Sequence, residues 1–596
     1  MSKKLDVVDD IVIIGAGFAG AFTAKQIITE TTRNVRLMDS LDKVLPDGGT
    51  SANQCFKLHT GMHYAGHLET AIQCLRDSIE FARELPDCIL GAEDNSLPWR
   101  RGRHYVMSNS LFNAEEVEKI AEALKAEYAS SIQKDERNRV FGDPEDFIRE
   151  LNRDEYSYIP DAISQFDTPK EGQALARDTS TSSAHITLAI ETPESQIDLN
   201  KLRVHLQTEL RASEKFIFFP HHEVKHIRFE PDSLNYLLEV YDSISRQMKL
   251  IRTKAIINCS WQNIEKLDQD LGYSVPDDGM IGTHRVIRIK ASLLIELPKD
   301  LRNINTCIFS VGPHCSITNL GNGTAIATYE PVTNVGSYEP GPNPEFSNPL
   351  LHEVIGKQLT PKEGAGAQLA AGIMTGVACY VPGLREATVL EVHVGYVKMF
   401  TNQGENYSLS EKESSIHQRI ENGLEEVGLA YLRNAAMKMT YSLNNAKRIV
   451  EAIEKQLFLR EKLERAIADV RDVLDKPAYS SLNKVIKDTA LFHSFREFIL
   501  SNIKHGLDHP KPSEEDIAPK KGKQPHLSKE DIATEIGNQM CTKQALLVSL
   551  VKTCQTRNKQ KHNKKRVVNS LSILFKKRNG MQVGGSPLSR SGYPIV

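Results

Sequence analysis

The first forty residues carry a pattern of apolar stretches and glycines that predicts a strand, a helix and a second strand. Four consecutive apolar residues, Ile11 to Ile14, run directly into a glycine, and such a short unbroken run is typical of a strand buried on both faces. A helix is predicted from Phe18 to about Thr29, and a second strand over Asn34–Met38. The order predicts a βαβ unit that ends at Asp39.

The glycines between strand and helix have the spacing of a phosphate-binding turn. Gly15 allows the tight turn, Gly17 lets the backbone approach a pyrophosphate, and Gly20 lets the helix pack closely on the sheet. The free N–H groups at the start of the helix, which include those near Phe18, favour a bound anion. An acid at Asp39 is placed to accept hydrogen bonds from ribose hydroxyls. The run predicted to contact a dinucleotide is therefore Gly15, Ala16, Gly17, Phe18, Ala19, Gly20, Asp39 and Ser40. A glycine turn without a ligand is the alternative.

Further along the chain the pattern predicts mixed α/β structure. A helix-like stretch covers Leu68 to Leu85, and alternation in Val286–Leu294 predicts an antiparallel strand. Strand-like pieces flank a Gly-Asn-Gly turn in Gly312–Thr328. The uncharged run Gly364–Pro382 is rich in Gly and Ala, so it predicts a buried helix rather than a membrane span.

The C-terminal part has a different pattern. Apolar residues recur at three- and four-residue steps between Ala446 and about Ile503, which predicts an appended helical bundle. Residues 505–530 have few apolar positions and predict a flexible linker, followed by a short helix over Ser528–Cys554. The last segment, Val551–Val596, has eleven Lys or Arg and no acid, so weak binding to an anionic surface is one possibility and a partnerless tail the other.

Composition excludes several classes. At 596 residues the chain is too long for one hydrophobic core, and its net charge of −3 gives no global attraction to nucleic acid. Nine scattered cysteines without a CxxC pair or Cys/His metal spacing favour free thiols in a reducing compartment, and no metal site is predicted. No apolar leader precedes the first strand, so a cytoplasmic protein is expected.

The segment after Asp39 separates FAD from NAD. A second alternating α/β half would be expected in an NAD dehydrogenase, but a polar loop, Asp47–Gly66, follows instead. This loop carries Gly49-Thr-Ser-Ala-Asn-Gln54 and His59-Thr-Gly-Met-His-Tyr64. With these elements the chain resembles FAD-dependent oxidoreductases of the D-amino acid oxidase superfamily, nearest to poorly characterised bacterial members. More distantly it resembles glycine oxidase, L-2-hydroxyglutarate oxidase and glycerol-3-phosphate dehydrogenase.

Later segments follow the order of that family. Gln196–Leu206 and Phe216–Phe229 resemble the helix and strand around the adenine, Ala255–Leu267 resembles the next strand and turn, and Val389–Val397 the strand that returns to the flavin. Departures from the family pattern stand at Cys259-Ser260 and at Arg433–Met437. The resemblance implies that FAD is bound, beyond the glycine turn, by Thr50, Ser51, Asn53, Gln54, Val224, Lys438, Met439 and Thr440.

The resemblance also implies an α/β fold with a Rossmann-like FAD-binding domain and an interleaved α+β substrate domain. The FAD-binding parts are expected at 1–90, 181–275 and 389–457, and the substrate parts at 91–180 and 276–388. A helical extension at 458–504 and a linker, short helix and basic tail at 505–596 complete the expected organisation.

In this family a hydride leaves a carbon that bears an amine or hydroxyl group and passes to flavin N5, so the expected substrate is a small amine, amino acid or 2-hydroxy acid. A hydroxy acid needs a general base, and the resemblance places His63, His59 and Tyr64 beside the flavin ring. Either histidine is alternatively a structural residue of a tight loop. His393 is a further candidate or a half-buried strand residue, and Lys438 is a candidate to stabilise the reduced ring. Four arginines are candidates to anchor a substrate carboxylate: Arg101, Arg103, Arg285 and Arg288.

Two functions remain open from the sequence. The first is an FAD-dependent oxidase or dehydrogenase whose electron acceptor is oxygen, a quinone or a protein. The second is a non-catalytic FAD-fold protein whose helical and basic C-terminus, residues 458–596, binds a partner or an anionic surface.

Overall fold

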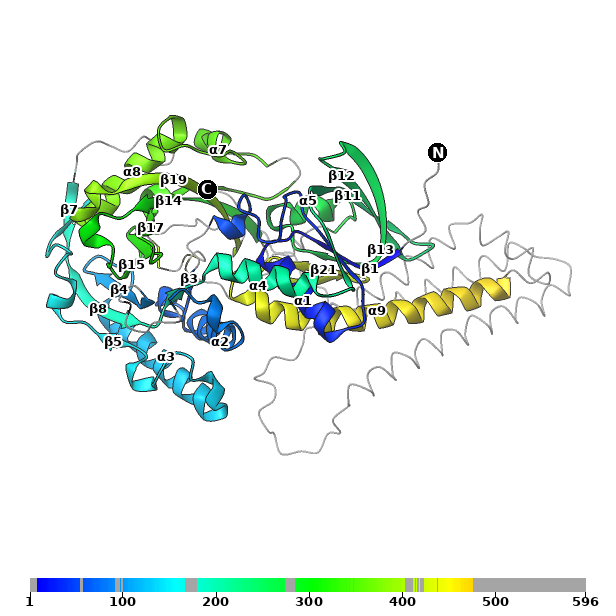
Figure 1. The fold of residues 1–596 in the computed structure, drawn as a ribbon, viewed down its shortest axis with the longest axis horizontal. Coiled ribbons are helices and arrows are strands. Elements are labelled where there is room, and N and C mark those ends of the chain that lie inside the picture. The colour runs from blue at the N-terminus through cyan, green and yellow to red at the C-terminus, as the bar shows by residue number, and fades with distance from the viewer. Residues whose placement is uncertain are drawn as a thin grey trace, which may run out of the picture. The chain divides into compact units, whose positions relative to one another are not determined.

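The computed structural model describes residues 8–53, 57–91, 97, 100–166, 180–273, 284–341, 344–346, 348–401, 411–412, 414, 417, 423–436 and 438–474. The fold is built on two large β-sheets with helices packed against them (Figure 1). The predicted helices beyond residue 474, the linker at 505–530, the basic tail and Gln54 lie outside the described residues.

The first sheet grows from the N-terminal βαβ unit. Its parallel part has the order β10 (Phe216–Phe219), β2 (Val35–Met38), β1 (Val8–Ile14), β13 (Gln247–Asn258) and β21 (Tyr431–Asn434). The side chains of Ile11 to Ile14 are all buried, because helices cover one face and a β-meander the other. The meander is antiparallel and runs from β11 (His222–Glu230) through β12 (Asn235–Asp242) into β13, while β20 (Leu424–Gly428) pairs with β21. This arrangement confirms the predicted Rossmann-like domain.

Helices from distant parts of the chain cover this sheet. Helix α1 (Phe18–Glu30) follows the glycine turn, and α4 (Leu199–Arg211) and α9 (Tyr441–Leu474) pack against α1. Their apolar residues join those of β1 and β13 in one core. The short α5 (Ile264–Gln269) follows β13 and closes the meander side.

The second sheet is mainly antiparallel and belongs to the predicted substrate region. Its order is β18 (Asn334–Tyr338), β14 (His284–Glu296), β17 (Thr324–Tyr329), β16 (Cys315–Asn319), β15 (Thr306–Ser310), β4 (Gly102–Met107), β8 (Ile186–Thr192) and β5 (Arg149–Glu150), with β19 (Thr388–Thr401) on the other side of β14. Helix α8 (Gly364–Tyr380) packs on this sheet and is buried over much of its length, as its composition predicted. The shorter helices α6 (Glu330–Thr333) and α7 (Pro349–Val354) lie beside it.

Helices α2 (Leu68–Glu84) and α3 (Ala114–Lys134) form a third cluster with β4 and β8. Two small ladders complete the fold: β3 (Lys57–Leu58) with β9 (Ser195–Gln196), and β6 (Ile163–Phe166) with β7 (Ser180–Ala184). Because β8 pairs with β4, the chain returns to the first sheet after Thr192 and not near residue 181, where the sequence placed the boundary. In the described part of the chain no helix is both long and apolar enough to cross a membrane.

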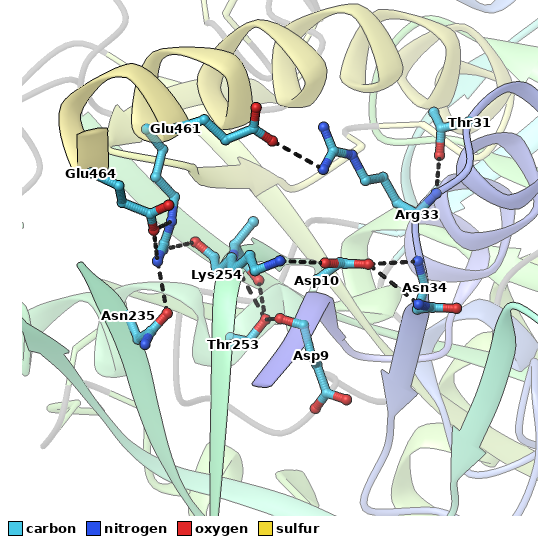
Figure 2. A network of polar contacts seen from close by, with 12 residues as sticks. Asp9, Asp10, Thr31, Arg33, Asn34, Asn235, Thr253, Lys254, Glu461 and Glu464 are labelled. Atoms are coloured by element: carbon cyan, nitrogen blue, oxygen red, sulfur yellow. Dashed lines mark hydrogen bonds and ion pairs between the residues drawn. The ribbon is translucent and has the colours of Figure 1, made fainter. Parts of the chain in front are cut away.

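Helix α9 runs without a break across residue 457, where the sequence predicted a separate extension to begin. Figure 2 shows how its far half is held to the first sheet. Arg460 is fully buried and donates hydrogen bonds to the carbonyl of Lys254, 2.6 Å away, and to Asn235 Oδ1 at 2.7 Å. Arg33, after α1, pairs with Glu461 of the helix (Figure 2) and also with Glu454. The turn of α9 that contains Arg460 therefore belongs to the same domain as α1 and the meander.

Candidate functional site

The glycine turn has the geometry that its spacing predicted. Gly15 has φ = +97°, and a Cβ there would lie 2.6 Å from the carbonyl oxygen of Cys259. A Cβ on Gly20 would lie 1.8 Å from the carbonyl oxygen of Gly15, so α1 approaches the turn too closely for any side chain. At Gly17 the nearest atom to such a Cβ is the hydroxyl of Ser51, at 2.9 Å. Backbone atoms thus exclude a side chain at Gly15 and Gly20, whereas at Gly17 the obstructing atom is the side-chain hydroxyl of Ser51.

Asp39 closes the opposite side of this turn. Its carboxylate accepts hydrogen bonds from the backbone N–H of Ala16, at 2.6 Å, and of Leu41, at 2.8 Å. Burial raises the pKa of this carboxyl group, although the two N–H groups act in the other direction. Ser51 accepts a hydrogen bond from the N–H of Phe18 in the first turn of α1. The loop after β2 is therefore tied to the helix N-terminus, where an anion is stabilised.

A single cavity of about 610 Å³ connects the glycine turn to the second sheet. Its size falls in the range of roughly 300–1,000 Å³ that is usual for ligand sites. At the glycine end lie Gly15, Gly17, Asp39 and Ser51, and the meander contributes Val224. At the other end the cavity reaches β14, β16, β17 and β19. It therefore has the position of a crevice at the carboxyl ends of parallel strands, where α/β sheets bind ligands.

At the far end, β3 and β9 bring His59 onto Glu194. Lys57 pairs with Gln196 and Leu58 with Ser195, so the antiparallel register puts His59 opposite Glu194. His59 Nδ1 lies 2.7 Å from Glu194 Oε1, and His104 Nε2 from β4 lies 3.2 Å from Oε2. Glu194 has no exposed surface, so this carboxylate is enclosed between two imidazoles.

Gly61 turns the chain so that His63 and Tyr64 also reach the cavity. Its φ is +112°, and a Cβ would lie 2.6 Å from the carbonyl oxygen of Ala71 on α2. The following 3-10 turn places His63 against His59, with 4.8 Å between ring centres and the rings tilted by 35°. Lys438 Nζ lies 4.0 Å from the centre of the Tyr64 ring. The three residues predicted for catalysis thus lie together with the predicted Lys438.

Burial and the nearby charges keep the imidazoles of His59 and His63 neutral. Burial lowers the pKa of His59 to about 4, and the charge of Lys438 adds to the effect against the opposing charge of Glu194. Burial and the neighbouring His59 lower the pKa of His63 well below its ordinary value. The pKa of Glu194 is held well below its usual range, because the two histidines outweigh the effect of burial. Near neutral pH the end of the cavity therefore holds neutral imidazoles and an ionised carboxylate.

A second charged group stands on the β14 side of the cavity. Lys290 pairs with Glu330 at 2.8 Å, and Arg288 precedes it by two residues on the same strand. Burial alone would raise the pKa of Glu330, but the charges of Lys290 and Arg288 lower it below its ordinary value. Two cations and one anion line this wall, so it is suited to a ligand that carries negative charge.

The other arginines named from the sequence have different partners. Arg101 and Arg103 both pair with Glu191 on β8, at 3.2 and 3.3 Å. Arg285 pairs with Glu425 and lies 3.7 Å from the centre of the Phe400 ring. Of the four, Arg288 is the one that lines the cavity. His393 contacts Glu391 at 2.8 Å and does not line the cavity, in agreement with its interpretation as a half-buried strand residue.

Most of the residues predicted to hold the cofactor line this cavity. Ala16 and Gly20 support the turn from behind, through the bond to Asp39 and the close helix contact. Thr440 is buried beside the cavity, and its hydroxyl, like that of Ser442, has no hydrogen-bond partner among the described residues. The predicted cofactor residues on the cavity wall are Gly15, Gly17, Phe18, Ala19, Asp39, Ser40, Thr50, Ser51, Asn53, Val224, Lys438 and Met439.

The segments that depart from the family pattern also reach this cavity. Cys259 and Ser260 line it next to Gly15, and Ala435 and Ala436 line it beside Lys438. Arg433 is buried and pairs with Asp268, so it supports the wall from outside.

Several residues of the site were not predicted from the sequence. Glu194, between β8 and β9, and His104, on β4, lie in segments that no motif marks, and Lys290 and Glu330 were not singled out. Lys57 was not predicted either, and the one local signal for it is its position two residues before His59. The others are brought together by the tertiary fold, Glu194 and His59 through the pairing of β3 with β9, and Lys290 and Glu330 through an ion pair between β14 and α6.

Comparisons with known proteins give structural similarity without sequence matches. No protein-family model and no curated protein matches the chain. Glycine oxidase from Geobacillus kaustophilus is 15% identical over 75% of this chain and 94% of its own, with a TM-score of 0.45. Iminodiacetate oxidase from Chelativorans sp. BNC1 is 12% identical over 75% and 95%, with a TM-score of 0.46. Glycerol-3-phosphate dehydrogenase from Bacillus halodurans, whose structure is complexed with FAD, is 11% identical over 76% and 65%, with a TM-score of 0.39. Two of these three enzymes are ones that the sequence resemblance named.

Proposed function

We propose that this protein is an FAD-dependent oxidoreductase that oxidises a small amine, amino acid or 2-hydroxy acid. The observation that carries the proposal is the continuous cavity, which joins a phosphate-type glycine turn to a cluster of histidines and cations. An elongated dinucleotide fits such a cavity, because its phosphates and its reacting ring require different surroundings.

The residues present suit FAD at both ends. Gly15, Gly17 and the start of α1 would hold the pyrophosphate, and Asp39 the ribose hydroxyls. Val224 would stand at the adenine side, and Lys438 with Met439 at the ring side. The buried hydroxyl of Ser442, which has no partner among the described residues, provides a further polar contact on the wall. When bound, the flavin supplies a two-electron acceptor for a substrate hydride.

The protein's own groups would bind the substrate and take its proton. Neutral imidazoles at His59 and His63 are proton acceptors at neutral pH, since their pKa values lie below ordinary ones. Arg288 and Lys290 would attract a carboxylate, and Glu330 a cationic amine. This mixed set of charges favours an amino acid or a hydroxy acid over an uncharged alcohol.

The visible spectrum of the purified protein tests the cofactor. Bands near ~450 nm, retained or restored by added FAD, are expected from an oxidised flavin. A protein that stays colourless after incubation with FAD would overturn the proposal.

A substrate panel tests the reaction. Amines, amino acids and 2-hydroxy acids are added anaerobically, and bleaching of the flavin bands is expected with at least one class. Readmission of oxygen, or addition of a quinone, then distinguishes an oxidase from a dehydrogenase. Bound FAD that no member of the panel reduces would favour the non-catalytic alternative.

A further inference from the structure

Glu194 has an environment that is unusual for a carboxylate. It is fully buried, and each of its two oxygens contacts a different imidazole, His59 Nδ1 at 2.7 Å and His104 Nε2 at 3.2 Å. A buried carboxylate is strongly destabilised unless it is paired and hydrogen-bonded. The fold therefore keeps an energetically unfavourable buried charge against Nδ1 of His59.

His104 fixes the far side of the carboxylate. It is buried on β4, and its Nδ1 lies 3.3 Å from the hydroxyl of Ser310 on β15. Two strands of the second sheet therefore hold Glu194 from behind, while the short ladder of β3 and β9 fixes its register with His59. The carboxylate has little freedom to turn away from His59.

The contact determines which nitrogen of His59 carries a proton. An ionised carboxylate only accepts hydrogen bonds, so Nδ1 of His59 must donate. In a neutral imidazole the other nitrogen, Nε2, then bears the lone pair. His59 lines the cavity and keeps about a fifth of its side chain exposed, whereas Glu194 is enclosed. The protonated Nδ1 of His59 therefore faces the enclosed Glu194, and we infer that the lone pair on Nε2 faces the cavity.

We propose that Glu194 is a positioning residue that makes His59 the proton acceptor of the reaction. This inference rests on the proposed function. The substrate O–H or N–H proton would pass to Nε2 of His59, and a bound oxidised flavin would supply the acceptor for the hydride from the substrate C–H. The substrate gains a C=O or C=N bond, His59 becomes an imidazolium, and Glu194 remains ionised.

The surrounding charges make Glu194 necessary for this step. Lys438 and Lys57 both disfavour a positive charge on His59, and Glu194 favours one. An imidazolium at His59 would therefore lose its counter-ion if the carboxylate were removed. His63 lies against His59 and has no hydrogen-bond partner among the described residues, so no group of that part of the chain fixes its tautomer.

The first test reads the tautomer without any turnover. In protein labelled with ¹⁵N-histidine, two-bond correlations should assign His59 as the Nδ1–H form, with the signal identified by its loss in His59→Asn. In Glu194→Ala the acceptor for Nδ1–H is gone, and the Nδ1–H form should no longer predominate. The Nε2–H form of His59 in the unmodified protein would overturn the proposal, whether or not the variants fold.

The second test measures the chemical step in the FAD-loaded enzyme with a substrate from the panel. Glu194→Gln should slow flavin reduction by about 100-fold or more, with little change in substrate Kd, because general-base catalysis of this kind contributes ~10²–10⁴-fold. Formate should restore part of the rate in Glu194→Ala, since it can occupy the place of the lost carboxylate, and should not do so in His59→Ala.

Glu391→Gln is the matched control, because Glu391 also contacts a histidine, His393 Nε2 at 2.8 Å, but on a strand segment away from the cavity. Its reduction rate should be unchanged. An unchanged rate in Glu194→Gln, or a loss that formate never restores, would contradict the role of Glu194. Failure to bind or reduce FAD would contradict the proposed function instead, and the tautomer measurement would still decide the role of Glu194.

Discussion

Lys438 sets the charge around both cavity histidines at the scale of single residues. Its ammonium group lies over the ring of Tyr64, and its charge follows burial as the second cause of the lowered pKa of His59. The same charge lowers the pKa of His63, after burial and the neighbouring His59. The lysine therefore helps to keep both imidazoles neutral and able to accept a proton.

Replacing Lys438 by Met should raise the pKa values of both histidines toward their ordinary 6.5, because one of the groups that disfavour their charged forms is gone. Histidine ring signals followed by NMR during a pH titration measure this directly. Lys447→Met is the control: Lys447 lies on α9, which begins shortly after Lys438, and it pairs with Glu80 and Glu84, so its loss should leave His59 unchanged. Equal titration curves for Lys438→Met and the unmodified protein would contradict the prediction.

Alanine substitutions at Gly17 and Gly20 should distinguish an effect on ligand binding from an effect on packing. Gly17 has an ordinary φ of −67°, so its backbone conformation allows Ala, but the added Cβ would displace the side chain of Ser51 at the phosphate end of the cavity. Gly17→Ala should weaken FAD binding about tenfold, or ~1.4 kcal/mol, and change the free energy of unfolding by less than ~1 kcal/mol. Quenching of flavin fluorescence on titration gives the affinity.

Gly20→Ala should behave differently, because its Cβ would overlap a backbone oxygen. This variant is expected to lose thermal stability in the absence of FAD as well. A Gly17→Ala protein with unchanged FAD affinity would show that the turn is not the phosphate site.

Helix α9 is the element whose extent the sequence and the structure describe differently. Its apolar positions Ile449, Ile453 and Leu457 belong to the core around α1, and Leu463 packs on the turn between β11 and β12. Between them Arg460 donates to backbone carbonyls of that turn and of β13. Arg460 therefore holds the helix to the meander through hydrogen bonds from its guanidinium group to main-chain carbonyls.

Arg460→Met should therefore lower the free energy of unfolding by about 3 kcal/mol, because buried carbonyl groups lose a charged donor. Arg465→Met, on an exposed position one turn later, should change it by less than ~0.5 kcal/mol. Thermal or urea unfolding of the two variants gives the comparison. Similar stabilities would mean that the far half of α9 contributes nothing to the domain.

At the scale of the whole molecule, buried histidines make stability depend on pH. Burial lowers the pKa of His314 to about 4, where its Nδ1 lies 3.1 Å from the hydroxyl of Tyr380, and His59 has a similar value. The unfolded chain binds protons at these sites near pH 6.5, and the folded chain only near pH 4. Between these values the unfolded state holds more protons, so stability rises with pH there and is lost on acidification.

The thermal midpoint is therefore expected to fall as the pH is lowered from 6.5 toward 4. His314→Gln removes one of the titrating groups without touching the cavity, so its midpoint should fall less steeply over the same range. The unmodified protein, scanned in parallel at each pH, is the reference. Parallel slopes for the two proteins would contradict a protonation-linked loss at His314.

The sequence by itself determined the features that depend on neighbouring residues. The glycine turn, its strand and helix, and the buried helix at Gly364–Tyr380 follow from backbone sterics and apolar spacing within short stretches, so they were predicted nearly to the residue. His59, His63 and Tyr64 were found because they stand together in one loop. Tertiary structure alone decided that Glu194, 135 positions from His59, is the residue behind its ring. Tertiary structure also placed Arg288, of the four candidate arginines, on the cavity wall, and it brought Arg460 against the meander. Those outcomes depend on strand register and helix packing between segments that are distant in sequence, and neither is encoded locally by the identity of the side chains.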